Sequence, residues 1–218
     1  MIKLNLGCGA VRPEGWINTD SSINASLQKF PLIGKAMAKF FKRPQYHSKN
    51  FQYMNLNKQW TFNSNSVDIV YASHLFEHLS SKSASLFLKE SYRVLKPGGC
   101  IRIVVPDLYK ICKAYINEYE EGNTDDPTQY IMWAINMHRE NQYKNLNWAK
   151  KIIFGIQDYP HQHKYMYDEK SLLYKLKNTG FQDILSFEYG ISNYIKEIND
   201  VEGTKESYKS IYLEAIKK

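Results

Sequence analysis

The sequence predicts an α/β protein built around a mostly parallel sheet. A short apolar segment, Ile2–Leu6, ends in a glycine turn at Gly7 and Gly9. A second segment rich in β-branched residues, Val67–Ser73, is followed by a helical stretch and then by another apolar run, Cys100–Val105. Strands that alternate with helices are typical of α/β folds with parallel strands.

Composition indicates one folded domain. The chain has 218 residues, of which 43% are hydrophobic and 23% are charged, which is ordinary for a globular protein. No apolar run approaches a membrane span, and Lys3 and Asn5 interrupt any secretory-type core, so we expect a cytoplasmic protein. The three cysteines show no CxxC spacing, and we expect them to be reduced thiols rather than disulfides or zinc ligands.

Positive charge is concentrated near the amino terminus. The net charge is +7, and no acidic residue lies between Ser21 and Trp60. Apolar residues at loosely helical spacing in this region predict an inserted basic helix or lid at about 25–49. Such a patch can attract phosphates, acidic glycans or the surface of a membrane, and a solvated helix face explains it equally well.

The spacing of the first two predicted strands is short. Ile2–Leu6 and Gly15–Asp20 read as strands, and only five residues separate Gly9 from Gly15. A parallel crossover that contains a helix needs about 10 to 12 residues. We therefore expect the first helix to be lost or shortened to a turn.

The remaining elements follow from local signals. We expect strands at Asn50–Leu56, Val67–Ser73 and Cys100–Val105, and helices at Lys82–Leu95 and Asp168–Asn178. Residues 108–160 are too long for a simple connection and predict a helical cap over the carboxyl edge of the sheet. Two alternating segments, Ile184–Tyr189 and Ser210–Ile216, are expected to pair as antiparallel strands.

Taken together, these segments resemble the class I S-adenosylmethionine-dependent methyltransferases. Leu4-Asn-Leu-Gly-Cys-Gly9 is similar to the first motif of that family, and Asp20 to the acid that ends its second strand. The segments that resemble later motifs of the family are Val67–His74, Arg93–Gly99 and Ser210–Lys217. A narrower resemblance, to a bacterial subgroup that modifies surface polysaccharides and small molecules, rests on three segments: Gly15–Asp20, Ser73–His78 and His163–Asp168.

The resemblance implies a Rossmann-like sheet of seven strands with a reversed last strand, and S-adenosylmethionine bound across the carboxyl ends of the first two strands. The product would be S-adenosylhomocysteine. The chain is expected to form a single domain over residues 1–218, with the basic insertion at about 25–49 and the cap at about 108–160.

Cofactor contacts are expected from the ends of the predicted strands. Glycine lets the backbone approach a ligand closely, and a carboxylate can accept hydrogen bonds from both ribose hydroxyls. The family usually has Asp where this chain has Asn55, whose side-chain carbonyl can still accept a hydrogen bond from adenine. The expected cofactor-binding residues are Leu6, Gly7, Cys8, Gly9, Asp20, Asn55, Leu56, Ser73 and His74.

The histidine-containing segment at residues 74–78 also fits a different function, that of a zinc hydrolase. His74-Leu-Phe-Glu-His78 matches the H-x-x-E-H pattern of zinc hydrolases, in which two imidazoles one helical turn apart bind the metal. That pattern needs a long helix, whereas here it directly follows a predicted strand. We therefore expect no metal, and we expect His161 and His163 to be loop residues or substrate contacts.

Methyl transfer to a hydroxyl benefits from a general base. The expected catalytic candidates are His74, His78, His161 and His163, with Asp107 behind them and Glu77 in a structural or orienting role. Aromatic residues of the predicted cap could stack on a sugar or ring, although such residues more often belong to a core. They are Tyr130, Trp133, Tyr143, Trp148, Tyr165 and Tyr167.

These observations predict an enzyme that uses S-adenosylmethionine to O-methylate a carbohydrate or a small metabolite. Three alternatives remain: a nucleic-acid methyltransferase favoured by the basic patch, a zinc hydrolase built on residues 74–78, and a non-catalytic cofactor-binding module. The expected partner is a small-molecule or carbohydrate acceptor, with peripheral membrane contact through the basic insertion as a further option. Neither the acceptor nor the oligomeric state follows from the sequence.

Overall fold

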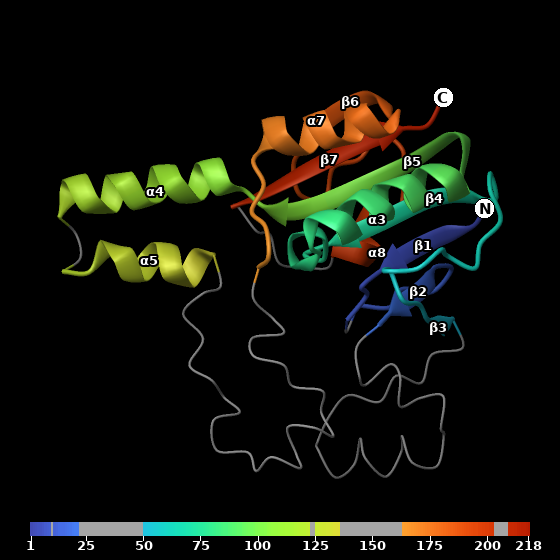
Figure 1. Cartoon of the computed structure of the whole chain (residues 1–218), viewed down its shortest axis with the longest axis horizontal. Coiled ribbons are helices and arrows are strands. Elements are labelled where there is room, and N and C mark those ends of the chain that lie inside the picture. Colours follow the sequence, from blue (N-terminus) through green and yellow to red (C-terminus); the bar gives the residue numbers. More distant parts are fainter. Residues whose placement is uncertain (10, 22–49, 123–124, 136–162, 203–208) are drawn as a thin grey trace, which may run out of the picture.

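The computed structural model describes residues 1–9, 11–21, 50–122, 125–135, 163–202 and 209–218. The described part forms one mixed sheet flanked by helices (Figure 1). The basic insertion expected at about 25–49 lies outside the described residues, and so does the expected cap from residue 136 onward. No helix in the described ranges is long and apolar enough to cross a membrane.

Seven strands form the sheet in the order β3-β2-β1-β4-β5-β7-β6. Strands β1 to β5 pair in parallel, and β7 runs antiparallel to both of its neighbours. The strands are β1 (Lys3–Leu6), β2 (Ile17–Asp20), β3 (Phe51–Tyr53), β4 (Val67–Ser73), β5 (Leu95–Pro106), β6 (Gln182–Phe187) and β7 (Ser210–Ile216). This topology confirms the predicted Rossmann-like sheet of seven strands with a reversed last strand.

Most predicted boundaries agree with the structure to within a few residues, with two differences. The strand expected at Asn50–Leu56 ends at Tyr53, because residue Asn55 begins a turn that its own side chain closes by accepting from the Asn57 backbone N–H at 2.9 Å. Strand β5 begins at Leu95 rather than at Cys100, because Leu95 already pairs with Val67. The register then shifts across Lys96–Gly99, and pairing resumes between Ile69 and Cys100.

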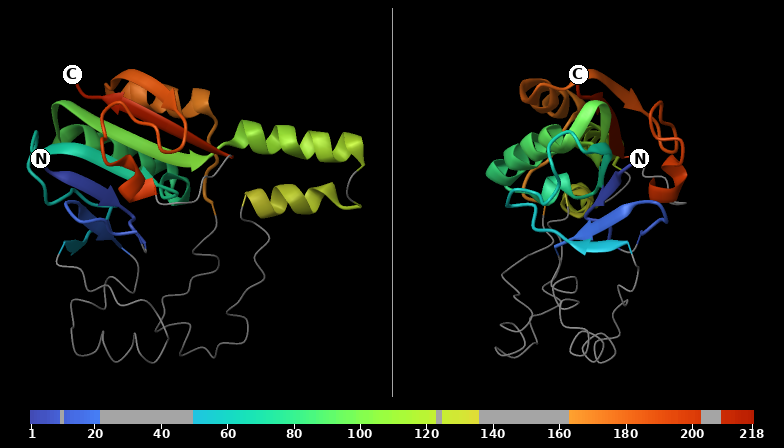
Figure 2. Two further views of the ribbon diagram at one scale, coloured as in Figure 1. Left: turned by 180° about the vertical axis from the view of Figure 1, so that it is seen from behind. Right: turned by 90° about the vertical axis from the view of Figure 1, so that its right-hand side faces the viewer.

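Helices cover both faces of the sheet. Helix α3 (Ser81–Val94) and helix α7 (Glu169–Thr179) lie on one face, and the short α8 (Ile198–Glu202) lies on the other (Figures 1 and 2). The side chains of Ser80 and Asp168 cap α3 and α7, and Gly180 ends α7 in a left-handed conformation.

Each face of the sheet has its own hydrophobic cluster. The larger one packs α3 and α7 against residues such as Leu4, Val70 and Ile103. The smaller one, on the α8 face, includes Trp16 and Tyr71, whose rings meet edge to face with centroids 6.2 Å apart. Trp16 lies in the connection between β1 and β2, so its ring covers part of the face that a helix in this connection would otherwise occupy.

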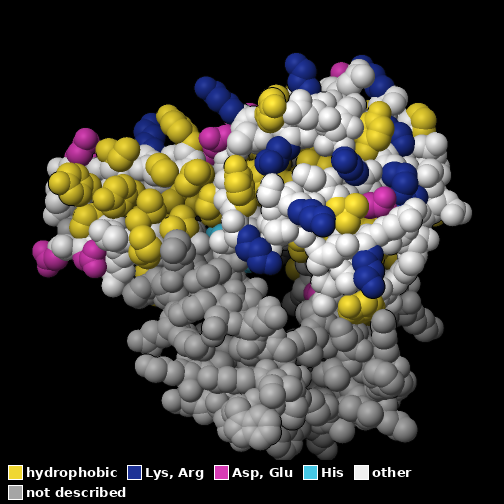
Figure 3. Space-filling model, viewed as in Figure 1, with side chains coloured by type: hydrophobic (Ala, Val, Ile, Leu, Met, Phe, Trp, Pro, Cys, Tyr) yellow, Lys and Arg dark blue, Asp and Glu magenta, His cyan; other side chains and the backbone are white. Residues whose placement is uncertain are grey.

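Helix α4 (Leu108–Glu121) begins at the carboxyl edge of β5 and extends away from the sheet, and α5 (Pro127–Ala134) runs back alongside it (Figure 1). Their helical structure agrees with the prediction for the start of the cap. Hydrophobic side chains gather on the face of this pair seen in Figure 3. The large exposed apolar residues of α4 and α5 are Tyr109, Ile116, Tyr119 and Trp133.

A buried ion cluster holds the reversed strand. Arg102 on β5 donates to Glu202 at 2.6 Å and to Glu214 on β7 at 3.0 Å, and all three side chains are almost fully buried. The same guanidinium donates to the backbone carbonyls of Glu188 and Ile191. Because each of these groups would be costly to bury unpaired, the cluster ties β5, β7, α8 and residues 188–191 together.

Replacement of Arg102 by Leu would leave two buried carboxylates without their cation. We expect the free energy of unfolding to fall by about 3–5 kcal/mol, measured by urea denaturation at neutral pH. As a control, Lys96→Ala removes an ion pair with Asp68 in which both side chains are partly exposed, and it should cost less than about 1 kcal/mol. Equal losses in the two variants would contradict this account.

Candidate active site

Functional side chains gather where the central parallel strands end. In the register of β1 and β4, Leu6 lies opposite Ala72, so Gly7 and Ser73 leave the sheet at the same edge. Strand β2 brings Asp20 to this edge from the other side of β1. In parallel sheets this edge is where ligands bind, at the point where the strand order reverses.

The connection between β1 and β2 contains no helix in its described residues, 7–9 and 11–16. The side chains of two buried asparagines donate hydrogen bonds to backbone carbonyls of this connection, which a helix would otherwise pair internally. The Asn5 amide donates to the Val11 carbonyl and to Asn18 Oδ1, both at 2.9 Å, and the Asn18 amide donates to the carbonyls of Pro13 and Trp16. These bonds satisfy carbonyl groups that would otherwise be left unpaired.

The glycines of this connection adopt conformations that favour glycine. Gly7 has φ +65° and Gly9 has φ +50°, both in the left-handed region. A Cβ at Gly7 would lie 2.9 Å from Leu75 Cδ1, whereas a Cβ at Gly9 would meet nothing within 4 Å. Gly7 thus lets the turn pack against the segment after β4, and the backbone at Gly9 faces open space that a ligand can approach.

Cys8 lies between these glycines and is structural. Its thiol is buried, and its backbone N–H donates to the Thr19 carbonyl at 3.0 Å. Burial raises the pKa of Cys8 to about 11, while Arg12 acts in the opposite direction. The thiol is therefore protonated at neutral pH and is a poor nucleophile.

His74 follows β4 in a left-handed conformation with φ +48°, which is uncommon for a residue other than glycine. Its backbone N–H donates to the Val104 carbonyl at 2.9 Å, so a hydrogen bond to β5 stabilises this uncommon backbone conformation. Its Nδ1 lies 3.4 Å from Glu77 Oε1, and its Nε2 lies 3.4 Å from Ser210 Oγ. With a proton on Nδ1 facing the carboxylate, Nε2 is the basic nitrogen of the ring.

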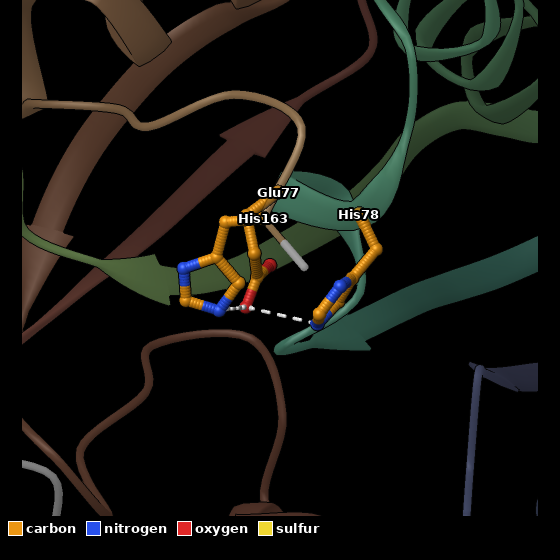
Figure 4. A group of neighbouring side chains, drawn as sticks. All are labelled: Glu77, His78 and His163. Atoms are coloured by element: carbon orange, nitrogen blue, oxygen red, sulfur yellow. Dashed lines mark ion pairs between the residues drawn. The ribbon is translucent and has the colours of Figure 1, made fainter. Parts of the chain in front are cut away.

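Glu77 is the centre of a group of imidazoles (Figure 4). It lies in the three-residue 3₁₀ helix η1 (Phe76–His78), and its side chain is 1% exposed. His78 Nε2 and His163 Nε2 lie 3.9 Å and 4.0 Å from Glu77 Oε1. The chain around His163 is anchored here, because Lys164 N and Tyr165 N both donate to the Glu77 backbone carbonyl.

The remaining residues predicted for cofactor binding or catalysis lie after β3, at the start of α4, or outside the described residues. Asn55 and Leu56 follow β3, and Leu56 is buried in the larger hydrophobic cluster. Asp107 caps α4 by accepting from Tyr109 N and Lys110 N, which is a structural role. His161, together with Tyr143 and Trp148, lies outside the described residues.

The aromatic residues that could stack on a substrate include both buried and exposed side chains. Tyr167 is 1% exposed and packs against Phe76 with ring centroids 4.9 Å apart, so it belongs to the core. Tyr165 and Trp133 are exposed, and Tyr130 accepts a hydrogen bond from Lys209.

Comparison with protein families gives one match, to a methyltransferase domain. Residues 4–103, which include the glycine turn, Asp20 and the His74–His78 segment, match the model of a methyltransferase domain family. The match covers slightly less than half of the 218 residues, and the seven-stranded sheet has the Rossmann-like topology of SAM-dependent methyltransferases. No curated protein sequence matches the chain.

Solved structures are similar to this chain at low sequence identity. A SAM-dependent methyltransferase from Archaeoglobus fulgidus is 17% identical, with 99% of this chain and 86% of that chain covered and a TM-score of 0.53. For a SAM-dependent methyltransferase from Methanosarcina mazei, the identity is 19%, the coverage 98% and 91%, and the TM-score 0.49. The CurJ carbon methyltransferase is 14% identical, with a TM-score of 0.49, and this chain spans 48% of its length.

Sequence reasoning missed three features of this site. The pairing of Asn5 with Asn18 was not expected, although two asparagines inside predicted strands are unusual and could have indicated it. Ser210 was expected only as part of a strand, yet it contacts His74. The burial of Glu77 among histidines was also not expected, because its partner His163 is distant in sequence.

We predict that Gly7→Ala weakens binding of S-adenosylhomocysteine by about tenfold or more, because a left-handed φ and contact with Leu75 both oppose the added Cβ. Isothermal titration calorimetry measures the effect. The matched control is Gly98→Ala, which has φ +79° but no atom within 4 Å of the added Cβ. It should lose about 1 kcal/mol of stability and bind the ligand normally. Normal binding by Gly7→Ala would exclude the turn from the cofactor site.

Proposed function

We propose that the enzyme O-methylates a carbohydrate or a small metabolite, with the acceptor hydroxyl held beside His74. The observation that carries this proposal is the position of His74 at the carboxyl end of β4, next to the glycine turn. Its Nδ1 faces a buried carboxylate, and its Nε2, which lies 3.4 Å from the Ser210 hydroxyl, would act as the base.

The residues at the strand ends fit the cofactor. The Gly7–Gly9 backbone is open to a ligand at Gly9, and Asp20 at the end of the adjacent strand can accept from ribose hydroxyls. No helix N-terminus follows β1 in the described residues, so the dipole that binds a pyrophosphate in nicotinamide enzymes is missing here. Binding of a cofactor without phosphate groups does not need this dipole.

When bound, S-adenosylmethionine supplies a methyl group on a sulfonium, and the neutral S-adenosylhomocysteine leaves. The chain must then orient the acceptor and remove its proton. Imidazole side chains accept protons near neutral pH, and the carboxylate of Glu77 stabilises the resulting imidazolium of His74 at 3.4 Å. An oxygen acceptor gains most from such a base, because a hydroxyl loses its proton when it is methylated.

We predict that Asp20→Asn weakens binding of S-adenosylhomocysteine by about 10- to 100-fold, the amount expected for a lost charge-assisted hydrogen bond. Calorimetric titration checks this value. Glu14→Gln is the matched control, since Glu14 is an exposed acid in the connection before β2, and its affinity should equal that of the parent. Unchanged affinity in Asp20→Asn would remove this carboxylate from the site.

We predict that His74→Asn lowers kcat by about 100-fold while the affinity for S-adenosylhomocysteine stays within about threefold. Asparagine tolerates the left-handed conformation of this position, so the backbone is kept. The assay follows transfer of radiolabelled methyl groups to a panel of sugars, nucleotide sugars and small alcohols, with transfer RNA as the competing acceptor. Preferred labelling of transfer RNA would contradict the proposed acceptor class, and full activity of His74→Asn would exclude its role as base.

A further inference from the structure

The side chains of Glu77, His78 and His163 form a compact group of metal-ligand type. One donor atom from each residue lies within 4.8 Å of the others (Figure 4). Two imidazoles and one carboxylate are the donor set of many sites for zinc and other divalent transition metals. The H-x-x-E-H helix is not what brings them together, since η1 is only three residues long. His163 completes the group from a distant part of the chain.

The state of Glu77 points to a cation. Both carboxylate oxygens are buried, and neither makes a hydrogen bond among the described residues, because the contact with His74 Nδ1 at 3.4 Å lacks hydrogen-bond geometry. A carboxylate without donors is costly to bury, by several kcal/mol or more, unless a positive charge lies beside it. Backbone N–H groups do not supply that charge, because the two amides at this point donate to the backbone carbonyl of Glu77 instead.

The distances suit ligands around a metal better than direct hydrogen bonds. The imidazole nitrogens of His78 and His163 lie 3.9 Å and 4.0 Å from Glu77 Oε1, beyond the usual hydrogen-bond range of about 2.7–3.2 Å. Two ligands of one tetrahedral zinc ion, each about 2.0–2.1 Å from it, lie about 3.4 Å apart. A shift of about half an ångström would therefore bring all three donors onto one ion.

We propose that Glu77, His78 and His163 bind one divalent transition-metal ion of the zinc class and leave at least one coordination position open. Three protein ligands with an open position are typical of catalytic rather than structural zinc sites. The location is also suitable, because His74 contacts the same carboxylate at 3.4 Å and follows β4 at the carboxyl edge.

The role of the ion follows from this position and rests on the proposed function. An acceptor hydroxyl bound at the open position would have its pKa lowered, as water bound to zinc does. Its proton would pass to Nε2 of His74, and the oxygen would use its electron pair to form a bond to the methyl carbon. The bond from this carbon to the sulfonium sulfur would break, and its electrons would stay on the sulfur of the departing S-adenosylhomocysteine. The metal would thus assist methyl transfer, in contrast to the hydrolysis that the H-x-x-E-H pattern suggests.

Metal binding can be tested without the acceptor. Chelator-treated protein with any histidine tag removed is titrated with Zn²⁺ by calorimetry, and bound zinc is counted by elemental analysis. We expect one ion per chain, and at least about a tenfold loss of affinity in each of Glu77→Gln, His78→Gln and His163→Gln. Glu169→Gln makes the same chemical change at an exposed position of α7 and should bind zinc like the parent.

Titration with S-adenosylhomocysteine on the same samples separates the two proposals and shows that each variant is folded. If this ligand binds but zinc does not bind, or binds equally in the three variants, the metal site is wrong and the proposed methyl transfer is unaffected. If zinc binds as described but S-adenosylhomocysteine does not, the cofactor site is wrong instead.

The open position has its own test. Co²⁺ is loaded in place of zinc, and acetohydroxamate, a ligand that binds exposed metal ions, is added. A change in the visible spectrum of the bound Co²⁺ is expected. An unchanged spectrum would show that the ion is fully coordinated, which would overturn its role in binding an acceptor.

Discussion

The parallel pairing of β1 with β4 is the constraint on which the site depends. Because Leu6 lies opposite Ala72, the glycine turn and the His74–His78 segment leave the sheet side by side. Leu75 then packs against Gly7, and a larger residue at this position would press on it. The glycine turn and His74 are therefore positioned by one pair of strands, and a change in the register of these strands would separate them.

Buried polar groups hold the connection after β1, whose described residues contain no helix. Asn5 and Asn18 bond the short connection from within the sheet, and Trp16 covers the face beside it. Farther along the sheet, Arg102 joins β5 to the reversed β7 through buried Glu214 and to α8 through buried Glu202. Strand β7 begins with Ser210, whose hydroxyl contacts His74, so the ion cluster that holds β7 also helps to position the His74 ring.

Local patterns in the sequence predicted most of the fold. Alternating and β-branched segments located the strands, and local signals indicated the helices at Lys82–Leu95 and Asp168–Asn178. The short spacing between Gly9 and Gly15 predicted the loss of the first helix, and the described residues of that connection contain none. The strand at residues 50–56 was predicted too long because its polar end closes an asparagine turn. The cofactor, S-adenosylmethionine, followed from the resemblance of several motifs taken together.

Contacts between distant segments could not be predicted in the same way. His78 and His163 are far apart in sequence, and their approach depends on the path of the chain before α7 and on two backbone bonds to Glu77. The pattern H-x-x-E-H suggested a helical zinc motif, whereas the structure gives Glu77 and His78 different partners from those the motif implies. Tertiary packing decided which of its residues share a site.

Hydrogen exchange measured by mass spectrometry, with and without S-adenosylhomocysteine, tests the central claim most directly: that one edge of the sheet, at β1 and β4, binds the cofactor. The account predicts slower exchange in peptides that cover residues 5–9 and in peptides that cover residues 72–78, with little change in α4. Unchanged exchange in both of these peptides, with protection elsewhere, would contradict it.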